Sequence, residues 1–139
     1  MQKGFDAWNR LKKTIHGNDS GRVYFHPREI WFAHFGANIG YEQDGRGDEF
    51  LRPLLVLRKF NNEVCWALPL TKVQKAGNPY YADFMYYPFP DDRRSAPLRS
   101  IAILSQLRLV DAKRLRYKIG TVPEDEFVPL KEKVRLLLA

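Results

Sequence analysis

A polar, glycine-containing stretch, residues 40–53, separates two runs of the chain that are typical of buried β-strands. Residues 28–35 before it are rich in aromatic and β-branched side chains, and residues 54–57 after it are apolar at every position. Charged loops between core strands are where protein scaffolds commonly display functional side chains. We therefore expect a sheet at the centre of the fold, with residues 40–53 forming one wall of a functional site.

Short strand-like runs ended by turn residues continue along most of the chain. Asn61 and Asn62 favour a tight hairpin turn, and Pro53 suits the first residue of a strand or an edge because it lacks a backbone donor. Asp111 is predicted to cap a helical turn, and Gly120 to follow a helix end. Besides residues 28–35, the predicted strands are residues 23–25, 54–60, 63–70, 80–87 and 100–110.

Two segments carry the apolar stripe of an amphipathic helix. In residues 5–15 the apolar side chains recur every three or four positions, and Pro123 followed by acidic residues marks the start of a second helix. We expect residues 1–19 to form a helical extension that packs on a single domain, residues 20–139, with docking on a protein partner as the alternative. The predicted fold is mainly β with flanking helices, as a strongly bent antiparallel barrel. The stripe of the second helix consists of Phe127, Leu130, Val134, Leu137 and Leu138.

Composition limits the class of protein and its partners. A chain of 139 residues with 45% hydrophobic residues can fill the core of one domain. It contains neither a long apolar run nor an apolar signal segment, so we expect a cytoplasmic protein without a membrane span. The single cysteine, Cys65, lies in an apolar run and is expected to be a buried thiol. The net charge of +7 favours nucleic acid, an anionic membrane or an acidic protein as partner, without choosing among them.

Four motifs in a fixed order carry a resemblance to a known family. They are Glu29-Ile30-Trp31; Gly40-Tyr41-Glu42-Gln43 with Gly45 and the later Arg52-Pro53-Leu54-Leu55-Val56; Pro69-Leu70-Thr71; and residues 103–115 with Ile119-Gly120. Together they resemble the MazF/PemK type of toxin endoribonuclease, over the chain from about Arg28 to the C-terminal helix. Each motif is weak alone, and their common order makes the resemblance specific.

The resemblance implies a small SH3-like barrel of the PemK/CcdB-like plasmid maintenance toxin fold. It also implies a homodimer that cuts single-stranded RNA without a metal ion or other cofactor, and a cognate antitoxin protein that holds it inactive. The catalytic residues of the family fall here on Arg52 and Thr71. Basic and amide side chains near the two loops suit contacts with RNA. The residues expected to bind RNA or to line the site are Glu42, Gln43, Arg46, Lys72 and Lys75.

The residue types fit this chemistry. Attack of a 2′-hydroxyl on its own phosphate gives a 2′,3′-cyclic phosphate and a 5′-hydroxyl, and needs proton transfer and stabilisation of charge on the phosphate oxygens. The guanidinium of Arg52 matches phosphate oxygens, although its high pKa makes it a poor base. The hydroxyl of Thr71 can donate to a phosphate oxygen, and one such donor is typically worth about 2.7 to 4 kcal/mol.

Other interpretations of these residues stay open at this point. Arg52 can instead pair with Asp48 or Glu49 to close the loop, and Glu42 can either orient Arg52 or contact a base. The loop between Glu42 and Arg52 is longer than in the compact family pattern, and Lys72 follows Thr71 where the family often has Ser. A non-enzymatic toxin, or a regulator that binds RNA or protein on the same fold, is therefore the alternative to a nuclease.

Overall fold

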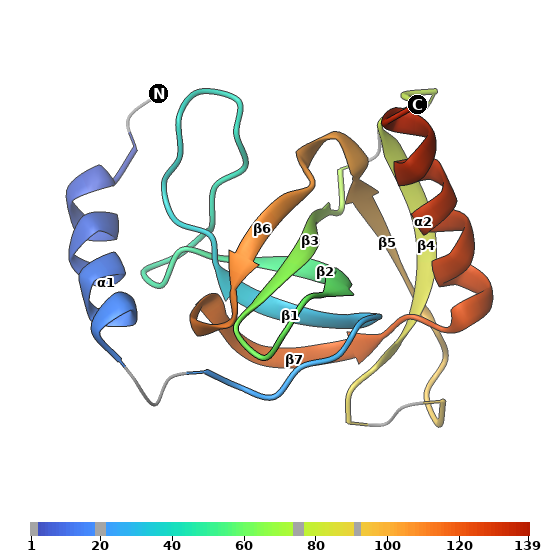
Figure 1. Cartoon of the computed structure of the whole chain (residues 1–139), viewed down its shortest axis with the longest axis horizontal. Helices are drawn as coiled ribbons and strands as arrows, with labels where there is room; N and C mark the ends of the chain where they lie inside the picture. The colour runs from blue at the N-terminus through green and yellow to red at the C-terminus, as the bar shows by residue number, and fades with distance from the viewer. Residues whose placement is uncertain (1–2, 19–21, 74–76, 91–92) are drawn as a thin grey trace.

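The structure is a computed structural model that describes residues 3–18, 22–73, 77–90 and 93–139 (Figure 1). Seven strands form one sheet, and two helices stand at opposite ends of the molecule. The strands are β1 (Glu29–His34), β2 (Leu51–Lys59), β3 (Val64–Thr71), β4 (Tyr81–Pro88), β5 (Leu98–Ile103), β6 (Arg108–Asp111) and β7 (Leu115–Thr121). The helices are α1 (Phe5–Gly17) and α2 (Glu124–Leu137), with the 3₁₀ turns η1 (Leu104–Gln106) and η2 (Ala112–Arg114).

The sheet closes into a barrel. Strands β2, β1, β7, β4, β5 and β3 are paired antiparallel in this order, and β3 pairs again with β2. Strand β6 pairs with residues 64–67 of β3, whereas β5 pairs with Leu70 and Thr71 farther along the same edge. A closed six-stranded antiparallel barrel with one helix near each end of the chain confirms the predicted fold class.

Two predicted turns are confirmed by their hydrogen bonds. The side-chain oxygen of Asn61 accepts from the backbone N–H groups of Glu63 and Val64, at 2.8 and 2.9 Å, and so closes the hairpin between β2 and β3. The carboxylate of Asp111 accepts from the N–H of Lys113 at 2.8 Å and caps η2. Both side chains satisfy donors that would otherwise lack a partner at a chain reversal.

Other local predictions are wrong. Residues 23–25 form no strand, and their apolar pattern reflects the burial of Phe25 in an irregular segment. Residues 100–110 are split by η1 into β5 and β6, which lets one continuous segment pair with two parts of β3. Pro53 is the third residue of β2 and not the first, but it pairs only with Phe32 and precedes the pairing with β3, so the predicted edge position is confirmed.

Gly120 lies inside β7 and does not follow a helix end. A Cβ atom at this position would lie 2.5 Å from the ring of Tyr86 and 2.8 Å from the carbonyl oxygen of Tyr87. The glycine therefore allows β4 and β7 to pair closely at Pro88 and Gly120, where the barrel closes. The sequence alone does not show that a neighbouring strand approaches this glycine so closely.

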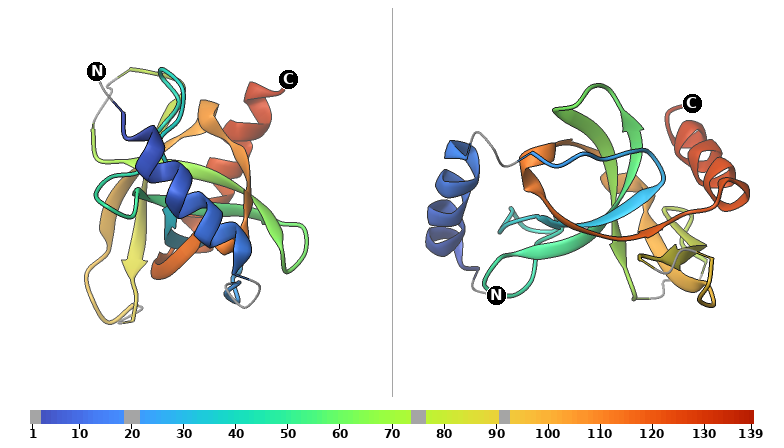
Figure 2. Two further views of the ribbon diagram at one scale, coloured as in Figure 1. Left: turned by 90° about the vertical axis from the view of Figure 1, so that its left-hand side faces the viewer. Right: turned by 90° about the horizontal axis from the view of Figure 1, so that it is seen from below.

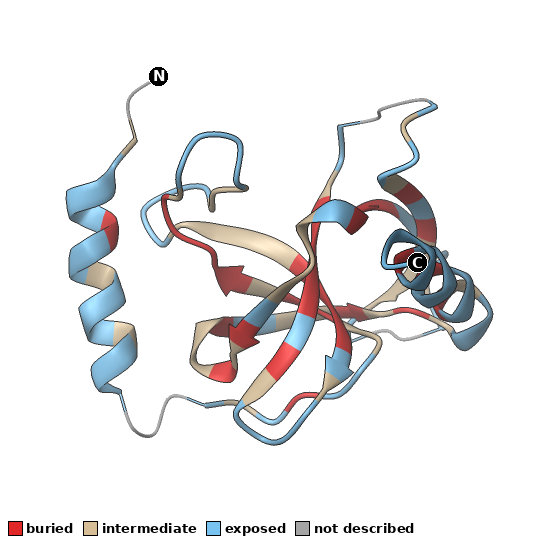
Figure 3. Ribbon diagram, turned by 45° about the horizontal axis from the view of Figure 1, so that its top comes forward, coloured by how far each residue is buried: buried red, intermediate tan, exposed pale blue. Residues whose placement is uncertain are grey.

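The core consists of two clusters, and α2 covers one of them (Figure 3). Phe127, Leu130 and Val134 bury the predicted stripe against the sheet, and each such side chain contributes about 1.5 to 3 kcal/mol. The stripe ends there, because Leu137 and Leu138 are 38% and 75% exposed. Extension of the stripe to the last residues was therefore wrong.

Helix α1 packs on the domain, as predicted, through a single buried residue (Figures 2 and 3). Trp8 is 7% exposed, whereas Phe5 is 50% exposed and most of the helix surface faces solvent.

Cys65 is a buried free thiol, also as predicted, and burial raises its pKa to about 11. In the described part of the chain no helix is long and apolar enough to cross a membrane.

Candidate active site

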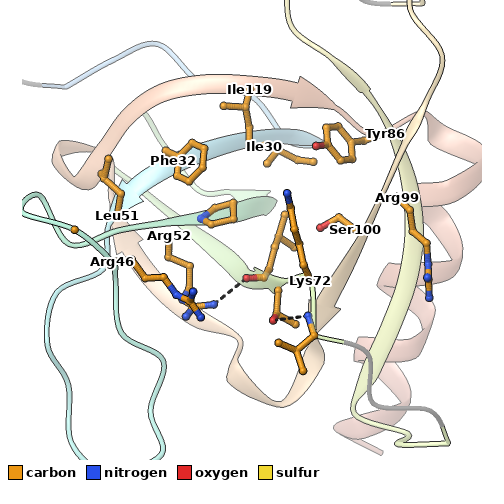
Figure 4. Close-up of a pocket in the computed structure, with 15 residues that line it drawn as sticks. Ile30, Phe32, Arg46, Leu51, Arg52, Lys72, Tyr86, Arg99, Ser100 and Ile119 are labelled. Atoms are coloured by element: carbon orange, nitrogen blue, oxygen red, sulfur yellow. Dashed lines mark hydrogen bonds between the residues drawn. The ribbon is translucent and has the colours of Figure 1, made fainter.

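All six strands of the closed barrel contribute to a pocket of about 740 Å³, here called the first pocket (Figure 4). Its walls are apolar on the side of β1, β4 and β7. The loop between β1 and β2 and the ends of β2 and β3 bring basic side chains to the other side. Among the described residues that line it, none is acidic, and the basic ones are Arg46, Arg52, Lys72 and Arg99.

The barrel holds Arg52 in a fixed position at this pocket. Its Nε donates to the carbonyl oxygen of Asp44 at 2.6 Å, and its Nη1 donates to the carbonyl oxygen of Leu70 at 3.1 Å. These two bonds connect the loop before β2 with the end of β3. A guanidinium carries five N–H donors, so the remaining ones can meet the oxygens of a bound anion without moving the side chain.

Two arginines of the first pocket lie close together, as Figure 4 shows for their labelled side chains. Burial lowers the pKa of Arg52, the charge of Arg46 lowers this pKa further, and Asp44 opposes both effects. Such a pair of like charges is unfavourable in the empty protein and is relieved when an anion binds between or beside the two groups. The pocket is therefore electrostatically suited to a phosphate group.

Thr71 and Lys72 line the first pocket at the end of β3, next to the carbonyl of Leu70 that holds Arg52. The hydroxyl oxygen of Thr71 accepts from the N–H of Val73 at 3.1 Å, which orients it while leaving its own proton available for donation. The exposed Lys72 extends into the pocket in the view of Figure 4. The structure thus brings together Arg46, Arg52, Thr71 and Lys72, which sequence motifs and charge had singled out.

Glu42 and Gln43 lie elsewhere, in a second pocket of about 680 Å³ that shares no residue with the first. The carboxylate of Glu42 accepts from the N–H of Ile39 at 2.9 Å, so it closes a turn of the loop, and its charge acts on Arg108. The N–H of Gln43 donates to the side-chain oxygen of Gln106 at 3.0 Å. The suggestion that Glu42 orients Arg52 is wrong, because backbone carbonyls do so.

The alternative pairing of Arg52 with Asp48 or Glu49 is also wrong. Within the described ranges Arg52 forms no ion pair, and Glu49 lies 3.3 Å from Arg116. The backbone carbonyl of Glu49 instead contacts Nδ1 of His34 at 2.7 Å, which ties the loop to the end of β1. The predicted RNA contact Lys75 lies outside the described residues.

Sequence analysis missed the groups that position the site. The carbonyl oxygens of Asp44 and Leu70 carry no signal of their role, because any residue supplies a carbonyl. Tyr86 and Ser100 line the first pocket from β4 and β5, which lie far from the loop in sequence.

Across the described ranges no group of three or more His, Cys, Asp or Glu residues is arranged to hold a metal ion.

Comparison with known proteins gives one family. A family model described as the PemK-like, MazF-like toxin of type II toxin–antitoxin systems matches residues 26–138. The matched region contains the whole barrel and α2, together with Arg52 and Thr71, and begins after α1. No curated protein matches the chain.

Proposed function

The chain belongs to the PemK-like, MazF-like toxin family of type II toxin–antitoxin systems, and on that premise we propose that it is an endoribonuclease that cuts single-stranded RNA without a metal ion. The observation that supports this activity is the first pocket. It combines basic side chains, no acidic lining among its described residues, an arginine fixed by two backbone carbonyls, and a threonine hydroxyl in the same pocket.

In the proposed reaction the 2′-oxygen of a ribose forms a bond with the adjacent phosphorus, and the bond from phosphorus to the 5′-oxygen breaks. The 2′-hydroxyl loses a proton and the leaving 5′-oxygen gains one, which leaves a 2′,3′-cyclic phosphate and a 5′-hydroxyl. Arg52 donates to the non-bridging phosphate oxygens, and Thr71 donates one further hydrogen bond. Because these donors are already in position, they stabilise the added charge without reorganisation.

The other predicted residues are proposed to bind RNA outside the scissile phosphate. Arg46 and Lys72 supply positive charge within the first pocket, and Lys75 follows Lys72 closely in sequence. Glu42 and Gln43 are proposed to act on a neighbouring nucleotide through the second pocket, and so to change RNA binding more than the chemical step. Single-stranded RNA suits such sites because its bases are free to enter them.

The family implies a cognate antitoxin as partner. We further propose that the protein is a homodimer and acts in the cytoplasm. Residues 1–19 are proposed to be an extension of a single barrel domain, residues 20–139, because the family model begins beyond α1.

The test is cleavage of a single-stranded RNA in the presence of EDTA, with both new ends mapped. The wild-type protein should give 2′,3′-cyclic phosphate and 5′-hydroxyl ends. Arg52→Ala should lower the cleavage rate by roughly 1,000-fold while the melting temperature stays close to the wild-type value. Arg58→Ala is the matched control, because Arg58 lies on the same strand outside the first pocket. Undiminished cutting by Arg52→Ala would overturn the assignment.

RNA binding without cleavage by the wild-type protein would favour the non-enzymatic regulator. In that case Arg52→Ala should weaken RNA binding, since the same guanidinium would still meet phosphate. Expression in a bacterial host separates the two functions further, because only the nuclease is expected to stop growth through RNA loss.

A further inference from the structure

Lys3, just before α1, has its ammonium group enclosed by the loop between β1 and β2. It donates to the carbonyl oxygens of Asn38 and Gly40, the second at 3.1 Å, and lies 3.0 Å from the carboxylate of Asp44. An ammonium has three N–H donors, and these three residues supply an acceptor for each. The side chain of Lys3 is only 9% exposed, so this is not a solvated surface pair.

The contact of α1 with the barrel lies at the base of the same loop. Trp8 packs 5.5 Å from the ring of Phe50, between ring centroids. A Cβ atom at Gly36 would lie 2.1 Å from the Trp8 ring, and Gly36 has φ +84°, which favours glycine. Gly36 and Phe50 are the points where the loop leaves β1 and approaches β2, so α1 fixes both ends of the loop.

Asp44 connects this extension to the first pocket. Its carboxylate receives Lys3 and also accepts from the N–H of Asn38 at 2.6 Å, whereas its backbone carbonyl accepts from Nε of Arg52 at 2.6 Å. A displacement of Asp44 therefore moves the acceptor that holds the Arg52 guanidinium. The path from Lys3 to Arg52 passes through a single residue and consists of two contacts of 3.0 Å or less.

We propose that Lys3 is a positioning residue for the nuclease reaction, and that the start of the N-terminal segment, residues 3–8, is a clamp that holds Asp44 so that Arg52 meets the scissile phosphate. This proposal rests on the proposed nuclease function. It goes beyond the family, because the clamp lies entirely before the residues that the family model matches. A role for Lys3 in attracting RNA by its charge alone does not explain the arrangement, because its ammonium points into the loop.

The first experiment compares Lys3→Met with Lys13→Met by single-turnover and steady-state cleavage of one RNA. Each variant loses one positive charge from the same segment, but Lys13 is exposed on α1 and forms no described contact with the loop. Lys3→Met should lower kcat by about tenfold, because a small displacement of a reacting group is enough to do so. Lys13→Met should leave kcat unchanged, and KM should change similarly in both.

Rescue by Lys3→Arg separates positioning from a general loss of packing. Arginine keeps the charge and several donors, so it should restore at least half of the wild-type kcat. The double variant Lys3→Met with Asp44→Asn should lose little more than the worse single variant, as expected when two residues act through one contact. A kcat for Lys3→Met equal to that of Lys13→Met, or strictly additive losses in the double variant, would overturn the proposal.

Hydrogen exchange tests the clamp without RNA. The amide N–H of Asn38 donates to Asp44, and that of Gly45 donates to the carbonyl of Gly36 at 2.8 Å. Lys3→Met should speed exchange at both amides by about fivefold or more, while amides of β3 keep wild-type protection. Unchanged exchange at Asn38 would refute the clamp even if the protein is a nuclease. Conversely, faster exchange in a protein that cuts no RNA would leave the clamp standing and refute the nuclease function.

Discussion

The two pockets differ in how the protein balances the charge of a half-buried arginine. In the first pocket burial lowers the pKa of Arg52, the charge of Arg46 lowers it further, and Asp44 opposes both effects. In the second pocket burial also lowers the pKa of Arg108, but Glu42 opposes this effect and the ring of Phe35 lies 4.9 Å from the guanidinium. Glu42 lines the second pocket itself, whereas no acidic residue is among the described residues that line the first, so a bound anion would supply the negative charge that this lining lacks.

The loop between β1 and β2 is divided between these two pockets. The chain before Asp44 lines the second pocket with Glu42 and Gln43, and the chain after it lines the first pocket with Arg46 and Gly47. Asp44 itself lies at the division, with its side chain bound to the loop and its carbonyl bound to Arg52. Residues that are adjacent in a motif therefore need not act on the same group of a substrate.

The largest effect should come from exchanging Arg52 for lysine, with Arg108→Lys as the matched variant in the second pocket. Arg52→Lys keeps the charge but loses the fork that binds two carbonyls and a phosphate together, so kcat should fall by roughly 1,000-fold. Arg108→Lys should change kcat by less than about threefold and raise KM, because we propose that the second pocket binds RNA away from the scissile phosphate. Single-turnover cleavage measures both. Equal losses of kcat in the two variants would show that the pockets form one catalytic unit.

Sequence motifs predicted the chemical contents of the first pocket but not its separation from the second. Arg52 and Thr71 come from the ends of paired strands, so an antiparallel hairpin already implies that they lie near each other. The position of Glu42 depends instead on a turn closed by its own side chain and on Gln106 from η1. No local pattern specifies either contact.

The barrel could also be predicted from local patterns, and the predictions that failed have physical causes. Apolar runs that alternate with turn residues predict antiparallel strands. The apolar stripe of residues 5–15 predicted a helix that packs on the domain. The break at η1 could not be predicted, since Ile103 and Leu104 are both buried and continue the apolar run across it. Likewise, burial of Phe25 in irregular chain gives the same pattern as a strand.

Thr71 allows the first pocket to be tested through its second proposed donor. Thr71→Val removes the proposed donor at nearly constant volume and should lower kcat by about 100-fold. Thr71→Ser keeps the hydroxyl, which still accepts from Val73, and should retain most of the activity. The same RNA and the kcat of each variant provide the measurement. If valine and serine have equal activity, the hydroxyl makes no contribution to the reaction.

Glu42→Ala tests the second pocket with a smaller expected effect. Loss of the hydrogen bond to the N–H of Ile39 should destabilise the turn by about 1 kcal/mol, seen as faster exchange of that amide. RNA affinity should change by a fewfold, and kcat should stay within about threefold of the wild-type value. A fall in kcat comparable to that of Thr71→Val would join Glu42 to the catalytic pocket and contradict the division at Asp44.

Glu29 tests whether acid sensitivity arises outside both pockets, and here the expected effect is smallest. Burial alone would raise the pKa of Glu29, but bonds from the His26 N–H, Trp31 and Lys118 outweigh it and lower the pKa below 4.5. A carboxylate whose pKa is lowered by folding stabilises the fold at pH values above its ordinary pKa. This stabilisation is lost as the pH falls through the lowered pKa. Glu29→Gln should therefore reduce the free energy of unfolding at pH 7 by under about 1 kcal/mol, and the difference from wild type should vanish once the pH falls below the lowered pKa. Because Glu29 lines neither pocket, kcat at pH 5 to 8 should match the wild type, and a shifted kcat profile would instead link β1 to the site.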